Sequence, residues 1–167
     1  MRRHVFLNAG DFYFHAATAQ PTPLVIRTLL GSCVSIVYWD KKRRSGGMSH
    51  SVLPVRSASY GPLDGNHCEG AMGLIMASLE RTQTHPVDYL VYLVGGSRMS
   101  IGIRAPDKVS VGDRNVQASR TLLQQNGFKL AGEHVGMSGP RRVTLDLDSG
   151  RIEVIHNNRT ILLAAPT

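Results

Sequence analysis

The sequence predicts an α+β fold, in which two helices pack on a mixed sheet within a single domain spanning residues 1–167. Three observations favour this class. Short apolar runs with the alternation of half-buried strands recur along most of the chain. Two other segments space their apolar residues as a helix does. The chain also has the ordinary length of one domain, sufficient for a substantial buried core.

The first third of the chain is predicted to form strands. Five apolar segments separated by turn residues carry this pattern: residues 5–7, 12–15, 24–30, 34–38 and 48–53. Two prolines mark residues 20–23 as a connector, because proline fixes φ and lacks an N–H donor. The polar segment 40–47 ends in two glycines, so we expect it to be the loop of a hairpin between the last two strands.

The rest of the chain is predicted to contain both helices and several further strands. Helical spacing of apolar residues predicts helices over residues 68–79 and 113–125, the first preceded by a polar loop at 55–66. The nearly continuous apolar run 88–94 is typical of a buried central strand. Three final strands are expected at residues 129–135, 142–147 and 151–155.

Composition and charge restrict the class of partner. The formal net charge is +7, which favours an anionic partner. Basic residues are nevertheless scattered apart from one run at 41–44, and aromatic residues make up only 6% of the chain. Since nucleic-acid binding usually combines basic with aromatic side chains, we expect no nucleic-acid partner. We interpret the basic run as a solvated turn, with attraction to an acidic protein surface as the alternative.

Neither membrane insertion nor secretion is expected. No apolar run approaches the roughly 20 residues that span a bilayer. Polar residues interrupt the N-terminal apolar stretch too early for a signal peptide. The two cysteines, Cys33 and Cys68, are too few for a disulfide framework, so we expect free thiols in a cytoplasmic protein.

The predicted hairpin carries the candidate chemistry, because it places Cys33 and His50 on neighbouring strands. If Tyr38 pairs with Gly47, Cys33 faces Val52 and His50 lies two residues away on the same face. Such diagonal neighbours are about 7–8 Å apart. A register shifted by two residues would make the pair directly opposite, and a shift by one would put the two side chains on opposite faces. The spacing therefore permits contact without requiring it.

A cysteine and a histidine in contact would suit nucleophilic catalysis. An ordinary thiol is a weak nucleophile until an imidazole takes its proton, and the imidazole can later protonate a leaving amine. A third group usually fixes the orientation of the imidazole, and the Thr28 hydroxyl is the candidate for that role. Gly31 would allow a tight turn before Cys33, so that main-chain N–H groups face a developing oxyanion.

The alternative interpretation is that Cys33 is a small buried hydrophobic residue at the start of an apolar strand. Spacing alone does not decide between the two. The remaining histidines show neither an HxH nor an HExxH pattern, so we expect no metal site. The chain also lacks the GxSxG pattern of one class of serine hydrolase.

An ordered series of motifs resembles the CheD family, the chemoreceptor glutamine deamidases of bacterial and archaeal chemotaxis. The motifs nearest the hairpin are TLLGSCV at 28–34, Asp40, GGMSH at 46–50 and LP at 53–54. Others, in order, are GDFY at 10–13, GGSRM at 95–99, GDRN at 112–115, GPRRV at 139–143 and SG at 149–150. The resemblance extends over nearly the whole chain, and the order of the motifs makes it specific.

The resemblance implies roles for individual residues. The nucleophile of the family corresponds to Cys33, its base to His50 and its third catalytic member to Thr28. Gly31 and Ser32 would support the turn and the oxyanion. The implied reaction converts a receptor glutamine to glutamate through a thioester on Cys33 and releases ammonia. It requires neither a cofactor nor a metal.

The resemblance also implies a fold and partners. The family fold is a compact α/β/α sandwich with a mixed, largely antiparallel sheet, similar to the catalytic domain of the cytotoxic necrotizing factor toxins. The protein substrates are methyl-accepting chemotaxis receptors, and many members also bind a CheC-type phosphatase.

Two alternatives to a glutamine deamidase remain to be tested. One is a binding module for a CheC-like phosphatase or a receptor, with little or no catalysis. The other is a cysteine hydrolase acting on a different amide. The presence of all three residues, Thr28, Cys33 and His50, favours an enzyme over a pure binding module.

Overall fold

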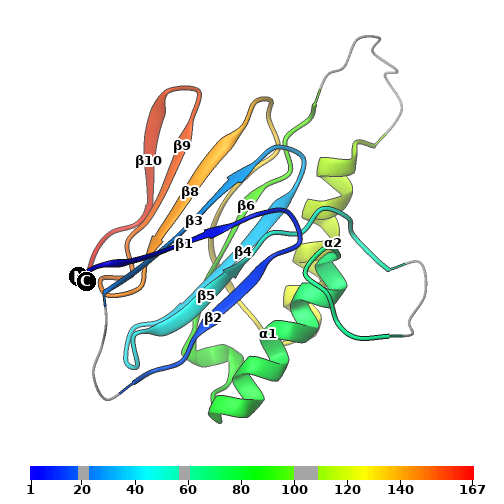
Figure 1. Ribbon diagram of the computed structural model, residues 1–167. Helices are drawn as coiled ribbons and strands as arrows, with labels where there is room; N and C mark the ends of the chain where they lie inside the picture. The colour runs from blue at the N-terminus through cyan, green and yellow to red at the C-terminus, as the bar shows by residue number, and fades with distance from the viewer. Residues whose placement is uncertain (19–22, 57–60, 100–108) are drawn as a thin grey trace.

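The computed structural model describes residues 1–18, 23–56, 61–99 and 109–167, which form two five-stranded sheets and two α-helices (Figure 1). The first sheet contains, in spatial order, β1 (Arg3–Leu7), β3 (Leu24–Leu30), β8 (Arg141–Asp146), β9 (Ile152–His156) and β10 (Arg159–Ala164). The second contains β2 (Phe12–His15), β5 (Ser45–Ser49), β4 (Val34–Asp40), β6 (Leu90–Gly95) and β7 (Leu130–Val135). The helices are α1 (Cys68–Thr82) and α2 (Val111–Gln125), and Pro86–Asp88 forms a 3₁₀ turn.

The molecule has three layers, in the order first sheet, second sheet, helices. One apolar cluster joins the two sheets and includes Ile26 from β3 and Val37 and Trp39 from β4. A second cluster joins the opposite face of the second sheet to α1 and α2, and includes Ile36 and Tyr38 from β4. Figure 1 shows both helices on the same side of the second sheet. Strand β4 is buried along its whole length because both of its faces are covered.

The α+β class and the mixed, largely antiparallel pairing are confirmed. The parallel pairings in the described residues are β1 with β3 and β6 with β7, and the other strand pairs are antiparallel. The expected α/β/α layering is wrong, because both helices cover the same sheet and a second sheet replaces the other helical layer. The physical reason is visible in β8, whose outward positions are polar (Arg142 is exposed, Thr144 partly so) and need no helix to cover them.

The hairpin differs from the sequence prediction in its boundaries, and it has the first of the registers considered, with Tyr38 paired with Gly47. Strand β5 begins at Ser45 and ends at Ser49, so the two glycines lie in the strand and the turn comprises residues 41–44. The predicted strand 48–53 therefore ends early, with Ser51 joined to Val34 by an isolated bridge. The final strand, β10, was not predicted. The expected connector at 20–23 falls mostly outside the described residues.

The basic run occupies the exposed turn at residues 41–44, which confirms its interpretation as a solvated turn. It lies at the opposite end of β4 from Cys33, about 25 Å away at the usual rise of a strand. Two of its charges are paired within the molecule, Arg43 with Asp40 (2.7 Å) and Arg44 with Asp148 (3.1 Å).

Gly47 is required for the close approach of strands β2, β5 and β4. A Cβ atom at this position would overlap the Tyr13 main-chain carbonyl of β2 and would also meet the Tyr38 hydroxyl of β4 at 2.8 Å. We therefore expect Gly47→Ala to lower the free energy of unfolding by about 1–3 kcal/mol, measured by chemical denaturation. The control is Ser45→Ala, which removes from the same strand a buried hydroxyl that has no hydrogen-bond partner among the described residues. Equal stability of the Gly47 variant and the wild type would contradict the tight packing of these strands.

Candidate active site

The centre of the site is a hydrogen-bonded chain that links the two sheets. The Thr28 hydroxyl, on β3 of the first sheet, donates to the main-chain carbonyl of Leu7 at 2.9 Å. The same oxygen lies 2.7 Å from Nδ1 of His50, which follows β5 of the second sheet. Thr28 is fully buried and His50 is 5% exposed, so water does not compete for these bonds. The structure thus brings together two of the three predicted catalytic side chains.

The chain of bonds determines the tautomer of His50. A hydroxyl has one hydrogen, and the carbonyl of Leu7 can only accept, so the Thr28 hydrogen is used in that bond. The close contact with Thr28 therefore requires that Nδ1 of His50 carries a hydrogen and donates it. Nε2 is left with a free lone pair, which is the form of imidazole that can accept a proton.

Main-chain bonds on both sides hold the backbone of His50. Its N–H donates to the carbonyl of Asp11, and its carbonyl accepts from the N–H of Gly10, each at 2.9 Å. These bonds continue the β2–β5 pairing into the turn before β2. On the other side, the Ser49 hydroxyl accepts from the Ile36 N–H at 3.1 Å, so a side chain replaces a main-chain partner just before His50.

Cys33 lies immediately before β4 on the face that the two sheets share. The structure pairs Tyr38 with Gly47 and Val34 with Ser51, which is the first register considered from the sequence. That register places Cys33 and His50 on the same face as diagonal neighbours. The Cys33 side chain packs against the apolar cluster between the sheets, and the residue is partly exposed.

No hydrogen bond joins Cys33 to His50 in the described part of the chain, although the two share a face. Catalytic hydrogen bonds are often longer before substrate binds than in the reacting complex. The structure therefore shows Thr28 and His50 in hydrogen-bonding contact, with Cys33 on the same face of the hairpin as His50.

Burial sets the charge state of both reactive groups. Burial raises the pKa of the Cys33 thiol, an effect only partly opposed by the N–H of the same residue. Burial also lowers the pKa of His50, against the smaller opposing effects of the Leu7 carbonyl and the Asp11 carboxylate. Both shifts favour the neutral forms, so at neutral pH the resting pair is a thiol and an uncharged imidazole.

Two hydrogen-bond donors hold the turn before Cys33, one a main-chain N–H and the other a side-chain amide. The Ser97 N–H donates to the Gly31 carbonyl at 2.9 Å, and the Asn115 side-chain amide donates to the Ser32 carbonyl at 3.0 Å. Both carbonyls are thereby directed into the protein, while the Cys33 N–H makes no hydrogen bond to another described residue. Gly31 and Ser32 thus occupy a turn held in place directly before Cys33.

Sequence reasoning did not identify the Leu7 carbonyl or Asn115 as parts of this site. A main-chain carbonyl carries no signal in the sequence. Asn115 lies in the GDRN motif, which marked it as part of the family pattern without indicating what it contacts.

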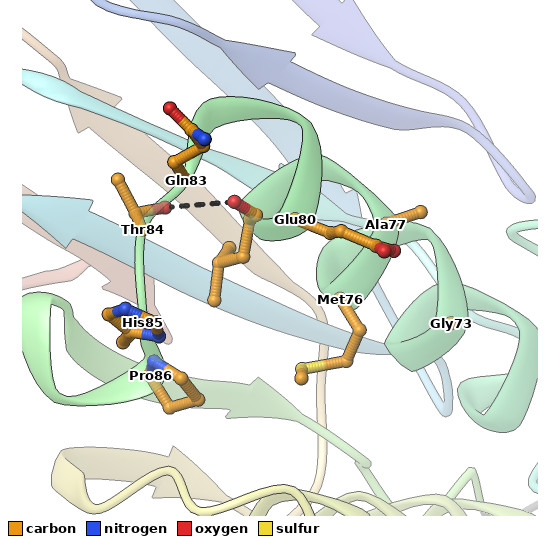
Figure 2. A pocket seen from close by; sticks show the side chains of 9 residues that line it. Gly73, Met76, Ala77, Glu80, Gln83, Thr84, His85 and Pro86 are labelled. Atoms are coloured by element: carbon orange, nitrogen blue, oxygen red, sulfur yellow. Dashed lines mark hydrogen bonds between the residues drawn. The ribbon is translucent and has the colours of Figure 1, made fainter.

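Other features of the described residues do not suggest a second catalytic centre. No group of three or more His, Cys, Asp or Glu side chains could hold a metal ion among them. A pocket of about 760 Å³ lies beside the C-terminal end of α1, and Figure 2 shows the side chains that line it. It is lined by Glu80, Thr84 and His85, among others, but by none of the three predicted catalytic residues. No helix in the described ranges has the length and apolar character needed to cross a membrane.

Comparisons with known proteins agree with the motif pattern. Residues 52–156 match a family model described as CheD chemotactic sensory transduction. A protein from Pseudomonas syringae named probable chemoreceptor glutamine deamidase CheD is 38% identical over 153 residues, 91% of this chain and 84% of its own length. A similarly named protein from Dechloromonas aromatica is 38% identical over 149 residues, covering 89% and 84%. One from Chromobacterium violaceum is 34% identical over 163 residues, covering 97% and 82%.

The two cysteines should differ sharply in their reaction with iodoacetamide. Cys68 is 1% exposed and burial raises its pKa to about 11, whereas Cys33 is partly exposed. Because alkylation requires the thiolate and the Cys33 pKa is raised, we expect labelling of Cys33 to accelerate as pH rises through and beyond the ordinary thiol range. Peptide mass spectrometry over a pH series measures this. Labelling of Cys33 that is already maximal in mild acid would contradict a neutral resting pair, and labelling of folded Cys68 would contradict its burial.

Proposed function

The chain belongs to the CheD family of chemoreceptor glutamine deamidases, and we propose that Cys33, His50 and Thr28 carry out its reaction. It converts receptor glutamines to glutamates in chemotaxis. The observation that best supports the proposed roles is the contact between the Thr28 hydroxyl and Nδ1 of His50, because it leaves Nε2 as a base. The partly exposed Cys33 lies on the same face of the hairpin.

The first half of the proposed reaction forms a thioester. As Sγ of Cys33 bonds to the amide carbon of the glutamine, Nε2 of His50 takes the thiol proton and the carbonyl π electrons move to oxygen. When this tetrahedral intermediate collapses, the C–N bond breaks and the nitrogen takes the proton from His50, leaving as ammonia. Thr28 stays hydrogen-bonded to Nδ1 throughout and stabilises the imidazolium that forms between the two steps.

The second half hydrolyses the thioester. His50 takes a proton from water as the water oxygen bonds to the thioester carbon. The second tetrahedral intermediate collapses with cleavage of the C–S bond, and the sulfur recovers a proton from His50. The products are a glutamate side chain and the free Cys33 thiol. The thiol and water supply the protons that are transferred, His50 relays them, and the carboxylic acid product ionises to glutamate.

Burial supports this sequence of events. A lowered His50 pKa keeps the imidazole uncharged and able to accept a proton at neutral pH. A raised Cys33 pKa means that the thiolate forms as the substrate is attacked and does not persist in the resting enzyme.

Several further features belong to the same proposal because the family resemblance alone supports them. We propose that residues 1–167 act as one domain in the cytoplasm, that the fold is related to the catalytic domain of the cytotoxic necrotizing factor toxins, and that a CheC-type phosphatase is a second partner. Superposition on a toxin catalytic domain tests the fold relation, and co-purification with a CheC-type protein tests the partner.

The proposed nucleophile predicts a specific loss of activity. Incubated with the cytoplasmic fragment of a chemoreceptor, the wild type should convert particular glutamines to glutamates, and Cys33→Ala should convert none because no thioester can form. Peptide mass spectrometry of the fragment measures the conversion at each site.

Cys68→Ala is the matched control, since it removes the other thiol from the core next to the helices. We expect it to retain the wild-type rate. Equal conversion by the wild type and Cys33→Ala would overturn the nucleophile assignment. Tight receptor binding without conversion by any of these proteins would favour the binding-module alternative.

A further inference from the structure

Asn115 is hydrogen-bonded to two segments of the site, one next to Cys33 and one next to His50. It lies in the second turn of α2 and is fully buried. Its Nδ2 donates to the carbonyl of Ser32 at 3.0 Å and to that of Val52 at 2.8 Å. Ser32 directly precedes Cys33, and Val52 follows His50 by two residues. One amide group therefore fixes the chain next to the nucleophile and next to the base.

The orientation of this amide follows from its partners. Both are main-chain carbonyls, which only accept, so the –NH₂ group must face them. Oδ1 of Asn115 has no hydrogen-bond partner among the described residues, although it is buried. An unpaired buried carbonyl destabilises a fold, so stability alone does not explain an asparagine at this position.

The bond to Ser32 fixes the direction of the next N–H group. The described peptide bonds are all trans, and in a trans peptide the C=O and N–H groups point in opposite directions. Because Asn115 holds the Ser32 carbonyl inside the protein, the Cys33 N–H points away from α2. This N–H makes no hydrogen bond to another described residue, so it is available to a bound substrate.

We infer that Asn115 is a positioning residue for deamidation: by holding the Ser32 carbonyl, it directs the Cys33 N–H at the oxygen that becomes negatively charged when Cys33 attacks the glutamine. The inference rests on the proposed function. A fixed N–H donor next to the nucleophile stabilises the tetrahedral intermediate without reorganising during the reaction. The bond to Val52 keeps His50 in register with the same turn.

The test separates oxyanion stabilisation from nucleophile reactivity. Deamidation passes through an oxyanion, whereas iodoacetamide reacts with a thiolate by displacement at a saturated carbon and forms none. For full-length Asn115→Ala, assayed with a receptor cytoplasmic fragment, we expect kcat to fall about 100-fold with KM little changed. The rate of Cys33 alkylation and its pH profile should stay at the wild-type values.

Two further variants control for general damage to α2. Asn115→Ser is a milder truncation whose hydroxyl is too short to serve both carbonyls, and it should show the same split between kcat and alkylation. Ser119→Ala removes a buried hydroxyl one turn later on the same helix and should behave as the wild type. Thermal denaturation establishes that each protein is folded at the assay temperature.

Three outcomes would overturn the inference. The first is a folded Asn115→Ala with the wild-type kcat. The second is a parallel loss of kcat and alkylation rate, which would indicate general disorder of the site. The third is unfolding of both Asn115 variants while Ser119→Ala folds, which would assign Asn115 to stability. A wild type that converts no glutamine would overturn the proposed function, and this inference with it. The three outcomes above concern Asn115 alone, so the two kinds of failure can be told apart.

Discussion

The hydrogen-bonded chain from Leu7 through Thr28 to His50 is the interaction on which the site depends. It crosses the space between the two sheets, so it exists only when their shared apolar core is packed. Each partner is held by its own strand pairing: Thr28 lies in β3 between β1 and β8, and His50 is bonded to the turn before β2. The tautomer of a single imidazole is therefore a consequence of the whole fold.

Burial also keeps Cys33 and His50 in the forms that general-base catalysis requires, a thiol that can lose a proton and an imidazole that can accept it. An exposed thiol and imidazole would titrate independently in water. Here burial shifts the two pKa values apart, down for His50 and up for Cys33, so that a neutral pair persists over a broad pH range. Proton transfer then coincides with attack on the substrate. Loss of contact with water produces both shifts, and the main-chain groups beside Cys33 and His50 only partly oppose them.

The sequence predicted local features well and long-range contacts poorly. Strand alternation left several registers open for the hairpin, and the structure has the first one considered, which places Cys33 and His50 on one face. The Thr28 hydroxyl was already a candidate from the sequence and the family resemblance implied its role, but nothing in the spacing shows that residues 28 and 50 meet across two sheets. The α/β/α layering that the family resemblance implied is wrong, and the sequence pattern could not correct it, because alternation in a strand reveals that a face is buried but not whether a helix or a sheet buries it. Gly46 and Gly47 resemble turn residues in sequence, yet they are strand residues whose neighbours leave no space for a side chain.

The tautomer of His50 determines whether this imidazole can act as a base, and ¹⁵N NMR of histidine-labelled protein at neutral pH measures it. The hydrogen-bonded chain through Thr28 predicts that His50 is uncharged, with a hydrogen on Nδ1 and none on Nε2. It also predicts that this preference is lost in Thr28→Val, which has the same shape but no hydroxyl, and is retained in Thr28→Ser. A hydrogen on Nε2 in the wild type would contradict the account, because His50 would then have no lone pair to offer to Cys33.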